Sequence, residues 1–350
     1  MKTSSRSWIN SLLIALLYGV NWGARNHPHF IDSFYSNKIY PSLYHARVFF
    51  FELFPFSLGD LFYLLGAIVI VKNLLGWKRI QRKNMGNIIL VPLLLFLWFQ
   101  LSWGLNYYKT PLNLKEVKTM DYSEEDLINT TALFARESNR LHFILSQNDS
   151  LAVVLNGTKK SLLKRIEESP STTPIKGKIK SSLYSKVLSY MGFSGYLNPF
   201  TLEAHVNIAI PKINLPLTAA HEMAHQQGYA AENEANYIGF LRCYQHPDQD
   251  IQYAALLFGL RYTLNELYRV NPEKARAIHC SLYPGILENI AETNRFWLAH
   301  KNPLEPFLKR SYDSYLKANN QPQGIQSYNA VVSLLIAHFK VIDNSASFKN

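Results

Sequence analysis

The run LPLTAAHEMAHQ contains the residues of this chain that are best suited to chemistry. Pro216 suits the first turn of a helix, and Gly228 suits its C-terminal end. On such a helix His221 and His225 project from one face, within reach of a single ion, and zinc favours their nitrogen atoms as ligands. Glu222 is rotated by about 100° from His221, so it flanks the ion. The pattern predicts a Zn2+ cofactor held by both histidines, with Glu222 as general base for a zinc-bound water.

An alternative explanation is a surface helix that carries two exposed histidines beside an acid. The residues around the motif are mostly apolar, and an unpartnered histidine or glutamate is costly in such surroundings. The apolar context therefore favours a metal site.

A third ligand is expected from the residues that follow, because a catalytic zinc usually takes three protein ligands and keeps one position open. Gly228 lets the chain reverse, and Glu232 and Glu234 follow His225 by 7 and 9 residues. Two residues apart on a helix, these carboxylates point to different sides, so only one of them can bind the ion. We prefer Glu232, since a first-turn carboxylate aims back most directly, and Glu234 stays the alternative. Asn236, one turn after Glu232, is predicted to hydrogen-bond a ligating histidine.

The stretches HEMAHQ and ENEAN resemble the gluzincin class of zinc metallopeptidases. In that class H-E-x-x-H supplies two ligands and the base, and E-x-x-x-D on a following helix supplies the third ligand, so the resemblance implies hydrolysis of peptide bonds. The chain departs from this pattern because Asn236 stands where an aspartate is usual and the gap after His225 is short. The gap is closer to that of the metzincins, but Ala231 stands at their third ligand position and cannot bind metal, which disfavours a metzincin.

A second resemblance covers nearly the whole chain and is to a bacterial family catalogued as a domain of unknown function. It rests on SGYLNPFTLEAHVNIAIPKINLPLTAAHEMAHQQGYAAENEANYIGFL and on SYDSYLKANNQPQGIQSYNAVVSLLIAHF. The resemblance implies three N-terminal membrane segments, an outer zincin-like domain and thus a membrane-anchored metallopeptidase. It implies no particular substrate.

In zincins the strand ahead of the active-site helix commonly binds substrate by strand addition. By that resemblance Ala204–Ile210 would be this edge strand, with His205 and Asn207 on one face; an ordinary strand with outward polar side chains is the alternative. The tetrahedral oxyanion also needs a hydrogen-bond donor, for which Tyr229 and Tyr328 are candidates. The chain has 21 tyrosines, so a purely structural role is the alternative for both.

From Ser123 onward the pattern predicts a mostly helical domain. Ser123-x-x-Asp126 is typical of a capping box at the start of a helix that runs to about Gln147. One strand is predicted at Glu203–Ile210, bounded by prolines. The other predicted helices are 150–168, 175–191, 251–270, 287–300 and 328–339.

Three apolar runs in the first third are predicted to be transmembrane helices, at about 7–24, 58–77 and 87–108. About 20 helical residues are needed to cross a hydrocarbon core of about 30 Å. We therefore expect a mostly α protein with a membrane domain at 1–108. An α-rich α+β zincin-like domain with a small edge-stranded sheet is expected at 109–350.

The short loops predict the orientation of these spans. The stretch from the last residues of the second run into the third holds five basic residues and no acid: Lys72, Lys78, Arg79, Arg82 and Lys83. The positive-inside rule places this loop and the N-terminus in the cytoplasm and the C-terminal domain outside. A cleaved signal peptide is the alternative for the first run, but no small-x-small cleavage site follows it. The expected location is the bacterial cytoplasmic (inner) membrane, as a multi-pass protein with the lipid bilayer as partner.

Composition excludes several other classes. With 48% hydrophobic and 17% charged residues the chain is not disordered. Residues 1–105 hold 10 Lys+Arg and 3 Asp+Glu, and so carry 7 of the 11 net positive charges. Residues 106–350 therefore lack the excess of basic residues that a nucleic-acid-binding domain would show. Cys243 and Cys280 are too few for a disulfide framework or a four-cysteine zinc ribbon, and they leave their redox state open.

The leading hypothesis from the sequence is zinc-dependent peptide hydrolysis outside the membrane. The alternative is a catalytically inactive, zinc-stabilised envelope binding or scaffold protein, which would tolerate Glu222→Gln. An intramembrane protease is disfavoured, because the motif begins more than a hundred residues after Tyr108 in a region without an 18-residue apolar run. A transporter is weaker still, since the predicted spans offer no intramembrane charge pairs. Substrate, specificity and oligomeric state stay open.

Overall fold

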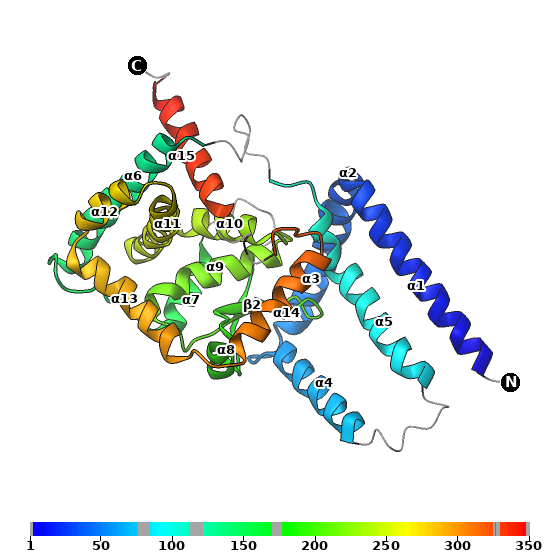
Figure 1. The fold of residues 1–350 in the computed structure, drawn as a ribbon. Helices are drawn as coiled ribbons and strands as arrows, with labels where there is room; N and C mark the ends of the chain where they lie inside the picture. The colour runs from blue at the N-terminus through cyan, green and yellow to red at the C-terminus, as the bar shows by residue number, and fades with distance from the viewer. Residues whose placement is uncertain are drawn as a thin grey trace. The chain divides into compact units, whose positions relative to one another are not determined.

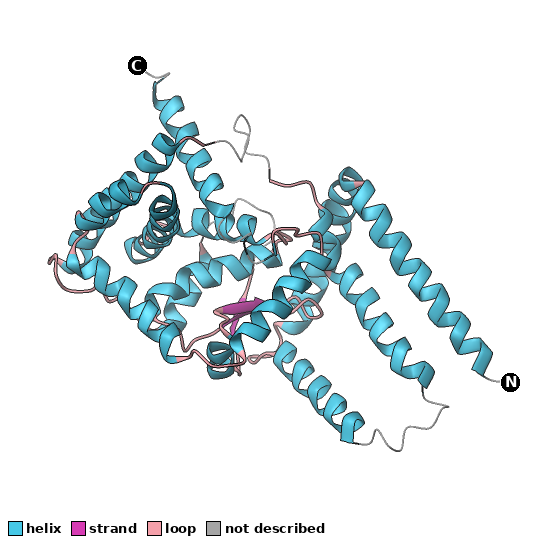
Figure 2. Cartoon of the chain, in the orientation of Figure 1, coloured by secondary structure: helices cyan, strands magenta, loops and turns pink. Residues whose placement is uncertain are grey.

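The structure, a computed structural model, describes residues 3–75, 85–112, 122–169, 177–324, 326 and 330–347. Helices make up nearly all of its regular structure, with one small sheet (Figures 1 and 2). The chain divides into two compact units. The first unit comprises Met1–Thr110 and Leu197–Glu203, and the second comprises Pro111–Tyr196 and Ala204–Asn350.

The regular structure of the first unit is helical among its described residues, apart from Leu197, which ends one of the strands given below. Its elements are α1 (Thr3–Asn26), α2 (Pro28–Phe30), the π-helical η1 (Ile31–Ile39), α3 (Tyr40–Phe51), α4 (Leu58–Leu75), α5 (Met85–Ser102) and the 3-10 helix η4 (Gly104–Tyr108). Asn21 connects α1 with α5 and η4, because its Oδ1 accepts hydrogen bonds from Gln100 of α5 at 3.0 Å and from the Tyr108 hydroxyl of η4 at 2.9 Å. The N-terminus of α4 is held by the buried carboxylate of Glu203, which accepts hydrogen bonds from the Gly59 N–H and from a threonine hydroxyl.

The predicted transmembrane helices are wrong, because no helix in the described ranges is both long and apolar enough to cross a membrane. Within the described residues α4 and α5 have 18 residues each, which is about 27 Å. α5 ends at Ser102, where the prediction continued to 108. α1 is longer, but Asn10 and Asn21 interrupt its apolar character. The predicted inner-membrane location and orientation are therefore contradicted as well, and the basic residues at 78–83 lie outside the described residues.

The second unit carries ten α-helices among its described residues. They are α6 (Glu124–Ser146), α7 (Lys159–Glu168), α8 (Ser185–Met191), α9 (Leu215–Gln226), α10 (Glu232–Tyr244), α11 (Gln249–Val270), α12 (Pro272–Cys280), α13 (Pro284–Ala299), α14 (Glu305–Ala318) and α15 (Val331–Ser347). Their core centres on the rings of Phe134, Phe240 and Phe339, whose centroids lie 5.3 to 6.4 Å apart. Cys243 is buried and Cys280 is exposed, and both are free thiols.

The sheet consists of β1 (Ile179–Ser181), β2 (Gly195–Leu197) and β3 (Ala204–Val206), in the order β1-β3-β2. β1 and β3 are parallel, with Lys180 opposite His205. The prediction that Ala204–Ile210 forms the edge strand is wrong, because β3 is the central strand. β3 is also shorter than predicted, since Asn207 leaves the strand to form a turn in which its side-chain oxygen accepts from the Ala209 N–H at 2.9 Å.

The predicted start of a helix is confirmed where a local capping motif determines it. The capping box of Ser123 and Asp126 is confirmed, and α6 ends before Gln147 in a left-handed cap. The predicted helix 150–168 begins only at Lys159, because Thr158 caps it after Gly157 has turned the chain at φ +80°. The region 175–191 contains β1 and α8 in place of one helix, and α12 and α14 were not predicted.

Candidate metal centre

The two histidines lie on α9, whose ends are set by the residues that the sequence singled out. Pro216 stands in the first turn, and the helix ends at Gln226. Gly228 then adopts φ +84°, a conformation that favours glycine, and the Tyr229 N–H returns to the Ala224 carbonyl at 3.1 Å. This reversal brings the start of α10 back beside α9.

Glu232, the first residue of α10, faces both histidines. Its Oε2 lies 3.3 Å from His221 Nε2 and 3.5 Å from His225 Nε2. One ligand atom from each of the three residues lies within 4.8 Å of the other two. The imidazole planes are nearly perpendicular, with centroids 4.6 Å apart. Three donor atoms of the types that zinc binds thus converge on one point.

The spacing fits a tetrahedral ion. Zinc bonds of about 2.1 Å at tetrahedral angles put neighbouring ligand atoms roughly 3.4 Å apart. The two distances from Glu232 Oε2 bracket that value. This oxygen is buried and makes no hydrogen bond to any other described residue, which is costly unless a cation compensates it.

Two further contacts orient the candidate ligands. His225 Nδ1 donates to the Tyr229 carbonyl oxygen at 2.7 Å, which leaves Nε2 without its proton in the neutral ring and turned toward the cluster. The Tyr312 hydroxyl, on α14, donates to Glu232 Oε1 at 2.7 Å. One oxygen of Glu232 is therefore held by a tyrosine while the other faces the histidines.

The charges of Glu232, His225 and Glu222 act strongly on one another. Burial alone would lower the pKa of His225, but Glu232, Glu222 and the Tyr229 carbonyl outweigh it and raise that pKa to about 9. Burial opposes the ionisation of Glu232, yet the two histidines hold its pKa well below its usual range. The carboxylate is therefore charged at neutral pH and ready to bind a cation.

Glu222 lies beside the cluster and outside it. It is 4% exposed, and its Oε2 has no hydrogen-bond partner among the described residues. Burial raises its pKa to about 7 against the lowering effect of the two histidines, and Glu232 adds to the rise. Gly195 of β2 packs directly on it, since a Cβ there would lie 2.7 Å from Glu222 Oε1 and 2.7 Å from the His205 carbonyl oxygen. Only glycine fits between them.

A second glycine sets the distance between α9 and α10. A Cβ on Gly239 would lie 2.9 Å from the backbone nitrogen of His221 and 3.1 Å from its Cα. Because Gly239 follows Glu232 by seven residues, about two helical turns, it lies on the same face of α10. The absence of a side chain there lets Glu232 approach the histidines.

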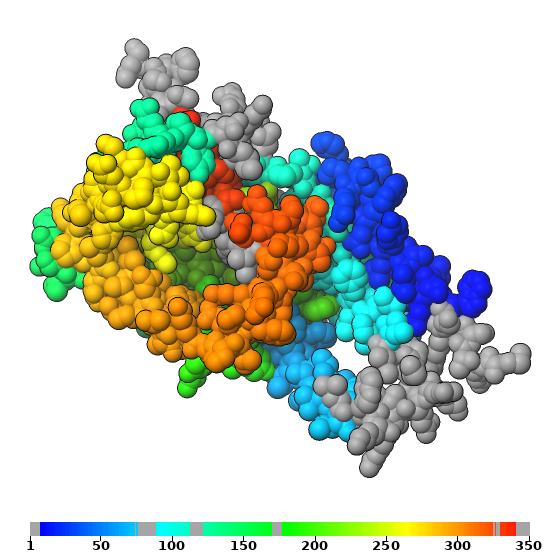
Figure 3. All heavy atoms as spheres, in the orientation of Figure 1, coloured from blue at the N-terminus to red at the C-terminus, as the bar shows by residue number. Residues whose placement is uncertain are grey.

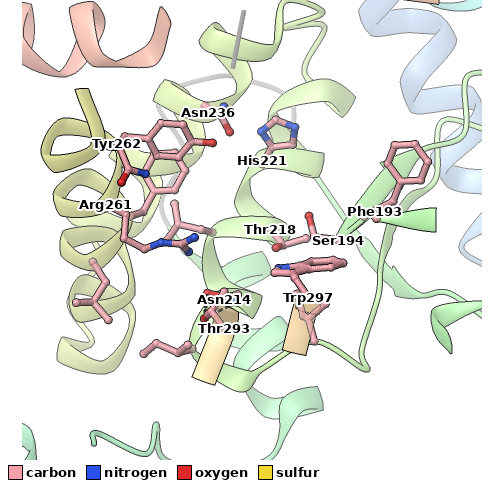
Figure 4. A pocket seen from close by; sticks show the side chains of 18 of the residues that line it. Phe193, Ser194, Asn214, Thr218, His221, Asn236, Arg261, Tyr262, Thr293 and Trp297 are labelled. Atoms are coloured by element: carbon pink, nitrogen blue, oxygen red, sulfur yellow. Dashed lines mark hydrogen bonds between the residues drawn. The ribbon is translucent and has the colours of Figure 1, made fainter. Parts of the chain in front are cut away.

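A cleft of about 820 Å3 opens at His221 and Glu222. In the space-filling view, green atoms lie recessed between those of α13 and α14 (Figure 3). Thr218 and His221 of α9 form one wall, Arg261 and Tyr262 of α11 another, and Trp297 of α13 a third (Figure 4). Such a cleft is large enough for a short peptide.

The other predicted site residues lie in different places. Glu234 is outside the cluster, and its Oε1 accepts from the Leu112 N–H at 2.7 Å. Asn236 lines the cleft, but its buried Nδ2 makes no hydrogen bond to a described residue, so the predicted contact with a histidine is not seen. His205 is fully buried and stacks on Tyr196 with centroids 4.5 Å apart. Tyr229 contributes its carbonyl, and its side chain does not line the cleft. Tyr328 lies outside the described residues.

Sequence reasoning missed three residues of this site. Tyr312 lies on a helix that was not predicted, although its sequence segment was noted for the family resemblance. Arg261 and Tyr262 lie on the predicted helix at 251–270. The sequence could have indicated them, because Ala254 and Leu257 start an apolar helix face on which the next residues at helical spacing, Arg261 and Tyr262, are polar.

Comparison with protein families assigns the chain. It belongs to the family described as "Protein of unknown function (DUF3810)", whose model matches residues 35–336. The predicted resemblance to a family of unknown function is thereby confirmed, and the matched region includes the cluster and the cleft. No curated protein and no solved structure matches the chain.

Proposed function

We propose that this protein is a zinc-dependent metallopeptidase that hydrolyses peptide bonds in the cleft at His221 and Glu222. The observation that carries the proposal is the approach of Glu232 Oε2 to both histidine Nε2 atoms at 3.3 and 3.5 Å. That arrangement gives three protein ligands on one side and a cleft on the other, as a catalytic zinc requires.

In this proposal His221, His225 and Glu232 hold the metal. Tyr312 fixes the Glu232 carboxylate through its Oε1, and the Tyr229 carbonyl fixes the tautomer of His225. A zinc ion held there would polarise the scissile carbonyl and lower the pKa of a bound water.

Glu222 is the proposed general base. Its carboxylate lines the cleft, is buried, and has an oxygen without a hydrogen-bond partner among the described residues. The burial that raises its pKa to about 7 suits it to accept a proton near neutral pH and to return that proton to the leaving amine.

The edge strand β2 is the proposed support for the substrate backbone. Ser194 and Gly195 line the cleft, and the Ser194 carbonyl accepts from the Asn207 N–H at 2.8 Å on the side of β3. The backbone N–H and C=O groups of successive residues point to opposite sides of a strand. Those of Gly195 therefore face the open edge of β2, where a peptide can add as a further strand. This assigns to β2 the role that the sequence had suggested for β3.

Tyr262 is the proposed donor to the oxyanion of the tetrahedral intermediate. Its hydroxyl is directed toward His221 (Figure 4), and it makes no hydrogen bond to another described residue. Burial raises the pKa of Tyr262, and the nearby Glu232 raises it further although Arg261 lowers it, so the hydroxyl keeps its proton. Replacing Tyr262 by Phe should lower kcat by about 100-fold, the loss typical of one oxyanion donor.

The test begins with the zinc content of the purified full chain. We expect one zinc per chain in wild type, loss of zinc in His225→Ala and Glu232→Gln, and retention in Glu234→Gln, the matched control. Wild type and Glu222→Gln are then compared on a pool of peptides by mass spectrometry. Cleavage that needs both zinc and Glu222 supports the proposal. A folded wild type without zinc contradicts it. One bound zinc without any Glu222-dependent cleavage also contradicts it and favours a zinc-stabilised scaffold.

A further inference from the structure

A basic side chain in the cleft, that of Arg261, has no counter-charge among the described residues. Arg261 is mostly buried, and it makes no hydrogen bond or ion pair with any described residue. The other cations of the cleft are matched: Arg269 pairs with Glu266 at 3.3 Å, and Lys309 pairs with an acid of its own helix at 2.6 Å. Arg261 thus differs from Arg269 and Lys309 in having no ion-pair partner among the described residues.

The position of Arg261 follows from the pattern of α11. The helix lines the cleft with residues at helical spacing, apolar at Leu257 and Phe258 and polar from Arg261 onward. The guanidinium extends from α11 across the cleft toward Thr218 of α9 (Figure 4). The side chain therefore points into the space that a substrate would fill.

Arg261 also lines the same cleft as His221, one of the residues of the metal-ligand cluster. Tyr262, the next residue of α11, directs its hydroxyl toward His221 (Figure 4). A ligand group bound by Arg261 would thus be close to any bond that reacts at the cluster.

A mostly buried, unpaired guanidinium is costly in a folded chain. Its five N–H donors form a planar fork that matches a carboxylate in two parallel hydrogen bonds. Leu257 and Trp297 add apolar side chains to the lining of the cleft, and such surroundings strengthen an ion pair. These properties suit a site that is completed by an anionic ligand.

We propose that Arg261 binds a carboxylate of the substrate, either the free C-terminus of a peptide or the side chain of an acidic residue next to the scissile bond. The inference rests on the proposed function and names the substrate class of that cleft. Removal of the carboxylate from the ligand should weaken binding by about 10- to 100-fold, the range for a hydrogen bond to a charged group.

The experiment uses zinc-loaded full-length Glu222→Gln, which binds without cleaving. Three pools of N-acetylated tetrapeptides are passed over the immobilised protein: free acids, C-terminal amides, and amides with glutamate at the last position. All other positions are randomised without acidic residues. Retained peptides are quantified by mass spectrometry, and the affinity of the most enriched one is measured by calorimetry.

Carboxylate-bearing pools should be retained about 10- to 100-fold over the plain amides, and adding Arg261→Gln should remove this preference. Arg261→Lys should restore part of it, because a lysine supplies the charge without the fork. Arg269→Gln, two turns further along α11 and already ion-paired, is the matched control and should keep the preference. Enrichment of the free acids alone identifies the C-terminal carboxylate, and enrichment of the glutamate pool identifies a side chain.

Equal retention of all pools, no retention of any pool, or a preference that survives Arg261→Gln would overturn the inference. Cleavage by wild type distinguishes this failure from that of the proposed function. Arg261-dependent binding without cleavage leaves the carboxylate site standing and contradicts the peptidase. Cleavage that requires Glu222 but not the substrate carboxylate supports the peptidase and contradicts the carboxylate site.

Discussion

Replacement of Gly239 by alanine should weaken zinc binding without touching a ligand. A Cβ at this position would stand 2.9 Å from the backbone nitrogen of His221, whereas ordinary contacts begin near 3.4 Å. α10 must therefore move away from α9 by roughly 0.5 Å, and Glu232 moves with it. Ligand distances in metal sites hold to within about 0.2 Å, so the shift exceeds what the site tolerates. We expect zinc affinity to fall about 10- to 100-fold, or ~1.4 to 2.7 kcal/mol.

The assay is competition with a chromophoric chelator, together with thermal unfolding in the presence and absence of zinc. Overpacking should also reduce stability by about 1 to 3 kcal/mol. Gly66→Ala is the matched control, because Gly66 lies within α4 with no atom near its missing Cβ. This control should keep the wild-type zinc affinity and gain up to about 1 kcal/mol of stability from the higher helix propensity of alanine. A folded Gly239→Ala protein that binds zinc as tightly as wild type would refute the reasoning.

Three more predictions follow from single contacts. Tyr312→Phe removes the hydrogen bond that fixes Glu232 and should lower zinc affinity about 10- to 100-fold in the chelator assay, whereas Tyr315→Phe on the same helix should not. Zinc must displace the proton that His225 holds below about pH 9. The affinity for zinc should therefore rise about tenfold per pH unit up to about pH 9 and then stay constant, and calorimetry should detect the released proton. A zinc affinity that does not change between pH 6 and 8 would contradict this. Glu203→Ala leaves the Gly59 N–H without its acceptor and should destabilise the first unit by about 1 to 3 kcal/mol in urea. Tryptophan fluorescence reports this unit, which contains five of the six tryptophans, and an unchanged midpoint would count against the role of Glu203.

The sequence was informative where a few neighbouring residues determine the geometry. Pro216 and Gly228 indicate the ends of the histidine-bearing helix, and the reversal at Gly228 explains why a residue at the start of the next helix can reach back. The register of α9 places the histidines on one face for the same local reason. These features depend on backbone preferences within about ten residues.

The remaining features depend on tertiary packing. Nothing near Glu232 in the sequence predicts Tyr312, and the function of Gly239 appears only when α9 lies against α10. The central position of β3 depends on pairing with β1, a segment that the pattern assigned to a helix. The membrane prediction failed because apolar content does not fix helix length: α5 stops at Ser102, within an apolar run that continues beyond it.

The hydrogen bond between Tyr312 and Glu232 joins residues 80 positions apart and makes the metal site part of the anchoring of α14. Within α14 only Leu316 is buried, so apolar burial holds this helix weakly. Metal loading should therefore slow amide hydrogen exchange along α14, and chelation should accelerate it, while the amides of α11 stay protected. Identical α14 exchange with and without metal would mean that other contacts hold the helix. If the coupling is present, the ion would also regulate how freely one wall of its own cleft opens to solvent.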